Sequence, residues 1–63
     1  MRKVNEIIYD NATVKIYFNS DYREYICRLF IDNKEQKDAA YFTDDKDDAN
    51  DTAKLMLSFA LIG

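Results

Sequence analysis

Apolar and polar residues alternate along the middle of the chain with the two-residue period of a β-strand. The alternation runs through residues 13–19 (TVKIYFN), pauses at a turn over residues 19–21, and resumes over residues 22–31. Because successive side chains of a strand point to opposite faces of a sheet, both segments predict strands with one side against a core. The more apolar sides consist of Val14, Ile16, Phe18, Tyr25, Cys27, Leu29 and Ile31.

A shorter strand is predicted at residues 37–43, after a turn over residues 32–36 (DNKEQ). Asp and Asn tolerate the left-handed backbone of tight hairpins, which matters in a chain without proline whose one glycine is Gly63. The pattern does not decide which side of this strand is buried. Two inward pairs are compatible with it, Ala39 with Tyr41 or Ala40 with Phe42.

The first eleven residues fit two structures. Val4, Ile7 and Ile8 have the spacing of one helix face, but the same segment also suits the first arm of a hairpin that turns at residues 10–11 (DN). We favour the hairpin, which adds a fourth strand to the sheet.

The last third of the chain has the 3.6-residue period of a helix. Thr43, Asp44 or Asp45 is suited to cap its start, because a short side-chain oxygen accepts a hydrogen bond from a free backbone N–H. Small residues lead one stripe of this helix, which lets it lie close against a sheet. That stripe consists of Ala49, Ala53, Met56, Leu57 and Ala60.

A second apolar stripe, formed by Leu55, Phe59 and Ile62, lies on another side of the helix. One sheet face does not readily cover both stripes. Either the second stripe packs under the N-terminal segment, or that segment is a strand elsewhere and the stripe is exposed. In the exposed case, the stripe is the candidate contact surface of a homodimer.

Together these elements predict an α+β fold: a three- or four-stranded antiparallel meander with a C-terminal helix packed on one face. With 63 residues, of which 48% are hydrophobic and 33% charged, the chain suits one small domain over residues 1–63. The single Cys27 indicates a reducing, cytoplasmic setting. The longest apolar run, residues 59–62, is too short to span a membrane.

Five aspartates cluster where the helix is expected to begin, and this pattern has three possible interpretations. A calcium loop needs glycine at its sixth position and glutamate at its twelfth, and no register of this segment supplies them. A mimic of nucleic-acid phosphate normally carries a larger net charge than −3. Favourable contact with the positive end of the helix dipole explains most of the cluster, so we expect no metal or cofactor. The cluster consists of Asp44, Asp45, Asp47, Asp48 and Asp51.

A single helix leaves the other sheet face open, and the alternation places cationic and aromatic residues there together. Such a mixture resembles a stacking platform for single-stranded nucleic acid. The alternative is that cross-strand pairs simply stabilise the sheet. The net charge of −3 argues against nucleic acid, because phosphate contacts supply much of its affinity. The expected residues of this face are Lys15, Tyr17, Glu24, Ile26, Arg28 and Phe30.

Little in the sequence supports catalysis. The chain has no histidine to act as a base, and Cys27 alternates with core residues, which predicts a buried thiol. We therefore expect a protein that is not an enzyme.

The order of three strands and a helix over residues 13–61 is similar to the double-stranded RNA-binding domain, with a hairpin, a third strand and an alanine-bearing helix. That family places lysines at the start of this helix, where the present chain has aspartates and only Lys46. The resemblance implies an arrangement of elements and argues against the activity.

Three segments also resemble small uncharacterised proteins of tailed bacteriophages: EYICRLF, KDAAYFTDDKDDA and DTAKLM, which span residues 24–56. The resemblance implies an origin and no mechanism. The sequence thus predicts a non-enzymatic protein-interaction domain, acting as a homodimer or on a host protein in the host cytoplasm. The alternatives are a nucleic-acid-binding module that uses the open sheet face, and an acidic nucleic-acid mimic. The candidate contact residues are Leu55, Phe59, Ile62, Tyr17, Ile26, Arg28 and Phe30.

Overall fold

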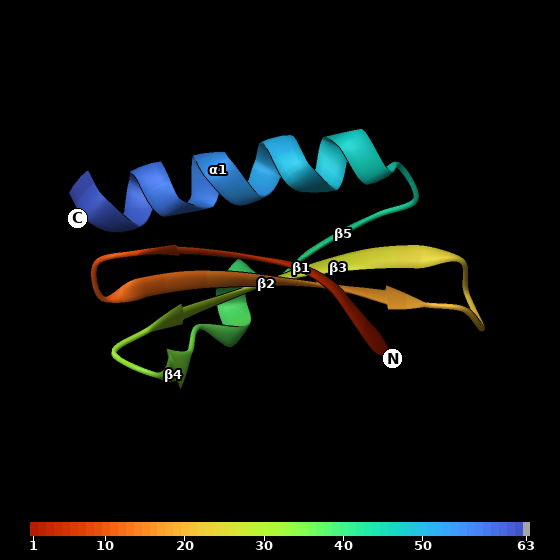
Figure 1. The fold of residues 1–63 in the computed structure, drawn as a ribbon, viewed down its shortest axis with the longest axis horizontal. Helices are drawn as coiled ribbons and strands as arrows, with labels where there is room; N and C mark the ends of the chain where they lie inside the picture. Colours follow the sequence, from red (N-terminus) through yellow and green to blue (C-terminus); the bar gives the residue numbers. More distant parts are fainter. Residues whose placement is uncertain (63) are drawn as a thin grey trace.

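The computed structural model describes residues 1–62, with side chains described up to residue 60. One helix lies along one face of an antiparallel sheet (Figure 1), which confirms the predicted α+β fold. The elements are β1 (Arg2–Tyr9), β2 (Ala12–Asn19), β3 (Glu24–Ile31), β4 (Lys34–Glu35), the 3-10 helix η1 (Lys37–Ala39), β5 (Tyr41–Thr43) and α1 (Lys46–Ile62).

The sheet is a meander whose outer edge is shared by two short strands. Its order is β1-β2-β3-β4, and β5 also pairs with β3. β4 lies beside Phe30 and Ile31, whereas β5 lies beside residues 25–27. The described sheet therefore has five strands where three or four were expected, because two short segments divide one edge of β3 between them.

The N-terminal segment is a strand, as we favoured, and not a helix. Tyr9 of β1 pairs with Ala12 of β2, so residues 10 and 11 alone form the turn. Asp10 occupies the left-handed region with φ 57°. Aspartate is among the few residues other than glycine that adopt this backbone at low cost.

The prediction of a strand over the whole of residues 37–43 is wrong in its first half. Lys37–Ala39 form a 3-10 helix, closed by a hydrogen bond from the Ala40 amide to the Lys37 carbonyl. Alanine has little preference for strands, so nothing local opposes the turn. The strand begins only at Tyr41. Of the two inward pairs, Ala39 packs against the core and Tyr41 contacts α1, while Phe42 lies on the far side of the sheet.

The core lies between α1 and the sides of β2 and β3 that face it. Ala49 and Ala53 of α1 have no exposed surface, so the helix backbone approaches the sheet closely. The distance of 3.3 Å from the Cys27 thiol, which donates, to the Ala49 carbonyl oxygen shows how close this approach is. The buried cluster consists of Ala12, Val14, Ile16, Cys27, Leu29, Ala49, Ala53 and Leu57.

Candidate interaction surface

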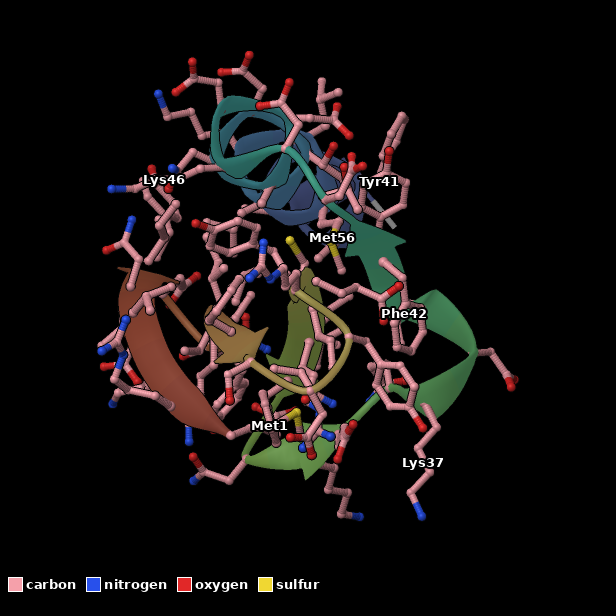
Figure 2. The ribbon with its side chains drawn as sticks, turned by 90° about the vertical axis from the view of Figure 1, so that its right-hand side faces the viewer. Met1, Lys37, Tyr41, Phe42, Lys46 and Met56 are labelled. Atoms are coloured by element: carbon pink, nitrogen blue, oxygen red, sulfur yellow. The ribbon has the colours of Figure 1, made fainter. Side chains whose placement is uncertain are left out.

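Two side-chain hydrogen bonds fix the rotation of α1 over the sheet. On one side, Asn5 of β1 donates to the Asn50 side-chain oxygen at 2.9 Å. On the other side, the Tyr41 hydroxyl of β5 donates to the Asp48 carboxylate at 2.7 Å. Figure 2, viewed from the end where the helix begins, shows Lys46 on the β1 side and Tyr41 on the opposite side.

These bonds identify the two flanks of the helix. Residues three or four apart lie on one face of a helix, so Asp48, Thr52, Leu55 and Phe59 form a single row. Because Asp48 is bonded to Tyr41, we call this row the β5 flank. The β1 flank consists of Lys46, Asn50 and Lys54.

The second apolar stripe is exposed on the β5 flank. Leu55 exposes 56% of its surface and Phe59 exposes 71%. Neither packs under the N-terminal segment, because β1 lies along the other flank of the helix. Ile62 ends α1, but its side chain lies outside the described residues. Leu55 and Phe59 thus form an uncovered apolar pair.

The contact between Tyr41 and Asp48 affects the titration of both groups. The hydrogen bond from Tyr41 lowers the pKa of Asp48 below its usual 3.8, and the hydroxyls of Thr43 and Thr52 act in the same direction. The same bond raises the pKa of the Tyr41 hydroxyl above its usual 10.0. Asp48 is therefore ionised near neutral pH and adds negative charge to the flank that carries Leu55.

Asp45 caps α1, and the aspartates around it show no metal-binding geometry. Asp45 accepts hydrogen bonds from the amides of Asp47 and Asp48, at 2.8 and 3.2 Å, and is the cap among the three candidates. Its own amide donates to the Thr43 hydroxyl at 3.2 Å. Across residues 1–62, no three His, Cys, Asp or Glu side chains are grouped so as to hold a metal ion.

The other four candidate contact residues lie together on the sheet face that is turned away from α1. Tyr17 pairs with Ile26, and Arg28 and Phe30 continue the same side of β3. The Arg28 guanidinium carbon lies 5.2 Å from the centre of the Tyr17 ring. The Lys15 ammonium lies 4.7 Å from the centre of the Phe30 ring.

These contacts occupy the aromatic rings and the cationic groups that a stacking platform for nucleic acid would need. Each of the two rings is covered by a cation of the neighbouring strand, and Arg28 also lies 3.9 Å from a Glu35 carboxylate oxygen. Ile26 is 5% exposed, so its own neighbours already cover it. The geometry is that of cross-strand pairs that stabilise a sheet.

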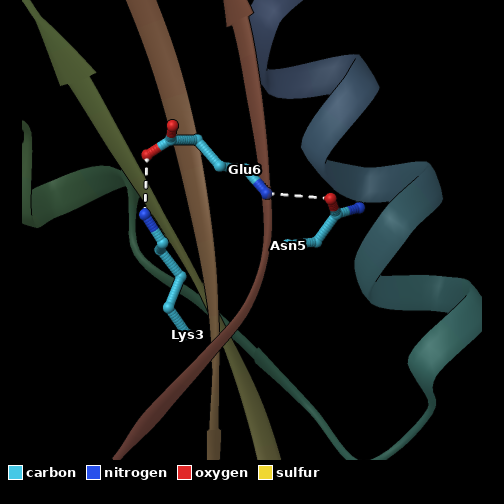
Figure 3. A network of polar contacts seen from close by, with 3 residues as sticks. All are labelled: Lys3, Asn5 and Glu6. Atoms are coloured by element: carbon cyan, nitrogen blue, oxygen red, sulfur yellow. Dashed lines mark hydrogen bonds and ion pairs between the residues drawn. The ribbon is translucent and has the colours of Figure 1, made fainter.

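The free edge of the sheet, β1, is irregular where it could otherwise pair with another strand. Lys3 pairs with Tyr17 and Asn5 pairs with Ile16, so Val4 is an extra residue in a bulge. The bulge places Lys3 and Glu6 on one side of the strand, where they form an ion pair at 3.2 Å (Figure 3). Bulges and charges at an edge strand oppose pairing with a further strand.

A hollow of about 540 Å³ lies at the outer edge of β3, next to β4 and η1. Its apolar lining comes from Leu29, Ile31 and Ala39. Charged and polar residues form the rest of its lining, namely Glu35, Gln36, Lys37 and Asp38. Because β4 and β5 share the outer edge of β3, the hollow lies at the same edge of the sheet as β5.

Cys27 is buried and unsuited to nucleophilic chemistry. Burial raises the pKa of its thiol from 9.0 to about 11, and the negative charge of Asp48 acts in the same direction. The reactive form of cysteine is the thiolate, which such a site disfavours.

Sequence reasoning did not anticipate the contact of Tyr41 with Asp48. The one sequence signal was the undecided inward side of residues 37–43, since Tyr41 reaches the helix only if the odd-numbered residues face α1.

Within residues 1–62, no helix is both long and apolar enough to span a membrane. Comparisons with protein-family models, with curated proteins and with solved structures gave no match.

Proposed function

We propose that this chain is a non-enzymatic protein-interaction domain and that Leu55 and Phe59 are its principal contact residues. The observation that carries the proposal is their exposure, 56% and 71%, at positions four apart on one helix flank. At that spacing the two side chains adjoin, so they form one apolar patch. Adjoining exposed apolar residues are typical of protein contact sites.

The resemblance of residues 24–56 to small proteins of tailed bacteriophages indicates which partner to seek first. We propose an accessory protein that acts on a host protein in the host cytoplasm. A second copy of the chain is the alternative partner, as the apolar stripe led us to expect.

Capture with matched variants tests this function. Tagged wild type is compared with L55S/F59S, and with I8S/Y9S as a control that removes two comparably exposed apolar residues from β1. We expect one identified protein to be captured by the wild type and the control but not by L55S/F59S, and to bind again as a purified component. Capture that is equal in all three variants would refute the proposed contact residues.

Sedimentation at micromolar concentration separates the two kinds of partner. A mass of one chain refutes a homodimer and leaves a different protein as the proposed partner. A mass of two chains that returns to one in L55S/F59S indicates a homodimer through the same flank.

A further inference from the structure

We infer that the β5 flank binds a basic amphipathic helix of another protein, with the apolar side of that helix on Leu55 and Phe59. This inference rests on the proposed function and names the chemistry of the partner. Leu55 and Phe59 supply the apolar contact, and the charges around them determine which kind of partner helix binds.

The two flanks of α1 differ in charge. On the β1 flank, Lys46 and Lys54 lie either side of Asn50, and Asp47, three residues before Asn50, shares that flank with them. On the β5 flank, Asp48 precedes Leu55 by seven residues, and Asp51 precedes it by four, so both lie on the same side as Leu55. The described part of the β5 flank carries no Lys or Arg.

The flank is therefore acidic in its first half and apolar in its second half. Asp48 is ionised near neutral pH, because the hydrogen bond from Tyr41 favours its carboxylate. Asp51 is exposed and extends the same charge, and the exposed Asp44 lies in the segment that joins β5 to α1. A partner that covers Leu55 and Phe59 and continues along the helix meets these carboxylates.

A second copy of the chain matches this pattern poorly. In an antiparallel arrangement centred between Leu55 and Phe59, Leu55 of one copy faces Phe59 of the other, but Asp48 and Asp51 meet no Lys or Arg of the described β5 flank. In a parallel arrangement, Asp51 faces Asp51. The first leaves the carboxylates without a cation and the second places like charges together, so neither arrangement uses the acidic half of the flank.

A helix with leucines on one side and lysines around them matches both halves. Its apolar side covers Leu55 and Phe59, and its ammonium groups face Asp44, Asp48 and Asp51. Opposite charges across the contact also favour encounter with this class of partner over acidic ones.

Labelled 18-residue model peptides test the inference by fluorescence anisotropy. One peptide has leucines on one side and lysines elsewhere, a second has the same leucines with glutamates, and a third keeps the lysines but has serines for leucines. We expect the Leu/Lys peptide to bind at least ten-fold more tightly than the other two. The F59S variant should lose at least ten-fold of that affinity, as expected for a central apolar contact.

A charge-matched pair of variants shows whether location matters. D44N/D51N removes one carboxylate between β5 and α1 and one in α1 four residues before Leu55, whereas D10N/D21N removes two from the turns that join β1 to β2 and β2 to β3. We expect D44N/D51N to weaken Leu/Lys binding by about five-fold and D10N/D21N to leave it unchanged, because exposed ion pairs act over short distances. Circular dichroism confirms that each variant remains folded.

Three results would overturn the inference: equal binding of the Leu/Lys and Leu/Glu peptides, equal effects of the two charge variants, or no binding of the Leu/Lys peptide. If the Leu/Lys and Leu/Glu peptides bind equally and F59S abolishes both, the basic partner is refuted while the proposed contact residues stand. If no peptide binds but the mass of two chains depends on Leu55 and Phe59, the partner is a second copy. If F59S has no effect on binding of any kind, the proposed function fails as well.

Discussion

The Tyr41 hydroxyl donates a hydrogen bond of 2.7 Å to the Asp48 carboxylate and so joins β5 to the first turns of α1. Asn5 and Asn50 make the corresponding contact of 2.9 Å from β1. With one bond to each side of the sheet, the helix cannot roll without breaking one of them. The exposure of Leu55 and Phe59 follows from this fixed rotation.

The Y41F variant should have a lower free energy of unfolding than the wild type at pH 7, and this difference should depend on pH. The folded-state pKa of Asp48 lies below its usual 3.8, so its bond stabilises the fold fully above that pH. The contribution is lost as the pH falls through the lowered folded-state pKa. Urea unfolding of wild type and Y41F should therefore differ at pH 7 and converge at acid pH.

The Y22F variant is the matched control for Y41F, because Tyr22 is 77% exposed in a loop. It should unfold like the wild type at both pH values. A difference between Y41F and wild type that persists unchanged at acid pH would show that the bond to Asp48 is not its cause.

The D45A variant should destabilise the protein by about 1 kcal/mol, because it removes the cap of α1. Asp45 accepts bonds from two amides that otherwise have no partner in the helix. The D44A variant removes an equal charge at the adjacent position, where no side-chain hydrogen bond is seen among the described residues. Equal losses in thermal unfolding of D45A and D44A would mean that charge, not the hydrogen bond, matters at this helix start.

The sequence was sufficient to predict β2, β3 and the helix because their apolar periods are uninterrupted. In β2, Val14 and Ile16 alternate with Lys15, and one side is buried as the period requires. Ala49, Ala53 and Leu57 recur at helical spacing and are buried against the sheet. Elements of this length are decided by which face is apolar, and that information is local.

The outer edge of the sheet was not predictable in the same way. β5 has three residues, and its position depends on pairing with Tyr25–Cys27 rather than on its own pattern. The bulge at Val4 also leaves no sequence signal, yet it places Lys3 and Glu6 on one side. The exposed pair Leu55 and Phe59 was foreseeable as one of two alternatives, since the choice depended on where β1 lies.

The difference in unfolding free energy between wild type and the C27A variant should narrow as the pH rises from 9 to 11. Burial raises the folded-state pKa of Cys27 from 9.0 to about 11. The contribution of the neutral thiol is therefore fully present below pH 9 and is lost as the pH rises through 11. Because C27A has no such group, the gap between the two urea midpoints should narrow over this range. A gap that stays constant from pH 8 to pH 11 would contradict a buried thiol.

Arg28 and Tyr17 should show a coupling energy of about 0.5–1 kcal/mol in a double-mutant cycle with R28M and Y17L. The reason is that the guanidinium carbon lies 5.2 Å from the ring centre across two paired strands. The same cycle with R28M and Y22F should be additive within about 0.5 kcal/mol, because Tyr22 lies in a loop. Additivity in both cycles would show that Arg28 does not hold the Tyr17 ring. The sheet face turned away from α1 would then again be a candidate nucleic-acid surface.

Leu57 and Phe59 lie two residues apart in α1, but truncation to alanine should lower the stability of the protein only at Leu57. Leu57 is 6% exposed in the core, so L57A should cost about 2–5 kcal/mol of unfolding free energy. Phe59 is 71% exposed, so F59A should change that free energy by less than about 0.5 kcal/mol. Both variants place alanine at a helix position, which keeps the effect on helix propensity similar. A large loss of stability in F59A, measured by chemical unfolding at low protein concentration, would mean that its ring packs within the chain. It would then be unavailable to a partner, whereas a small loss leaves it free for the contact proposed above.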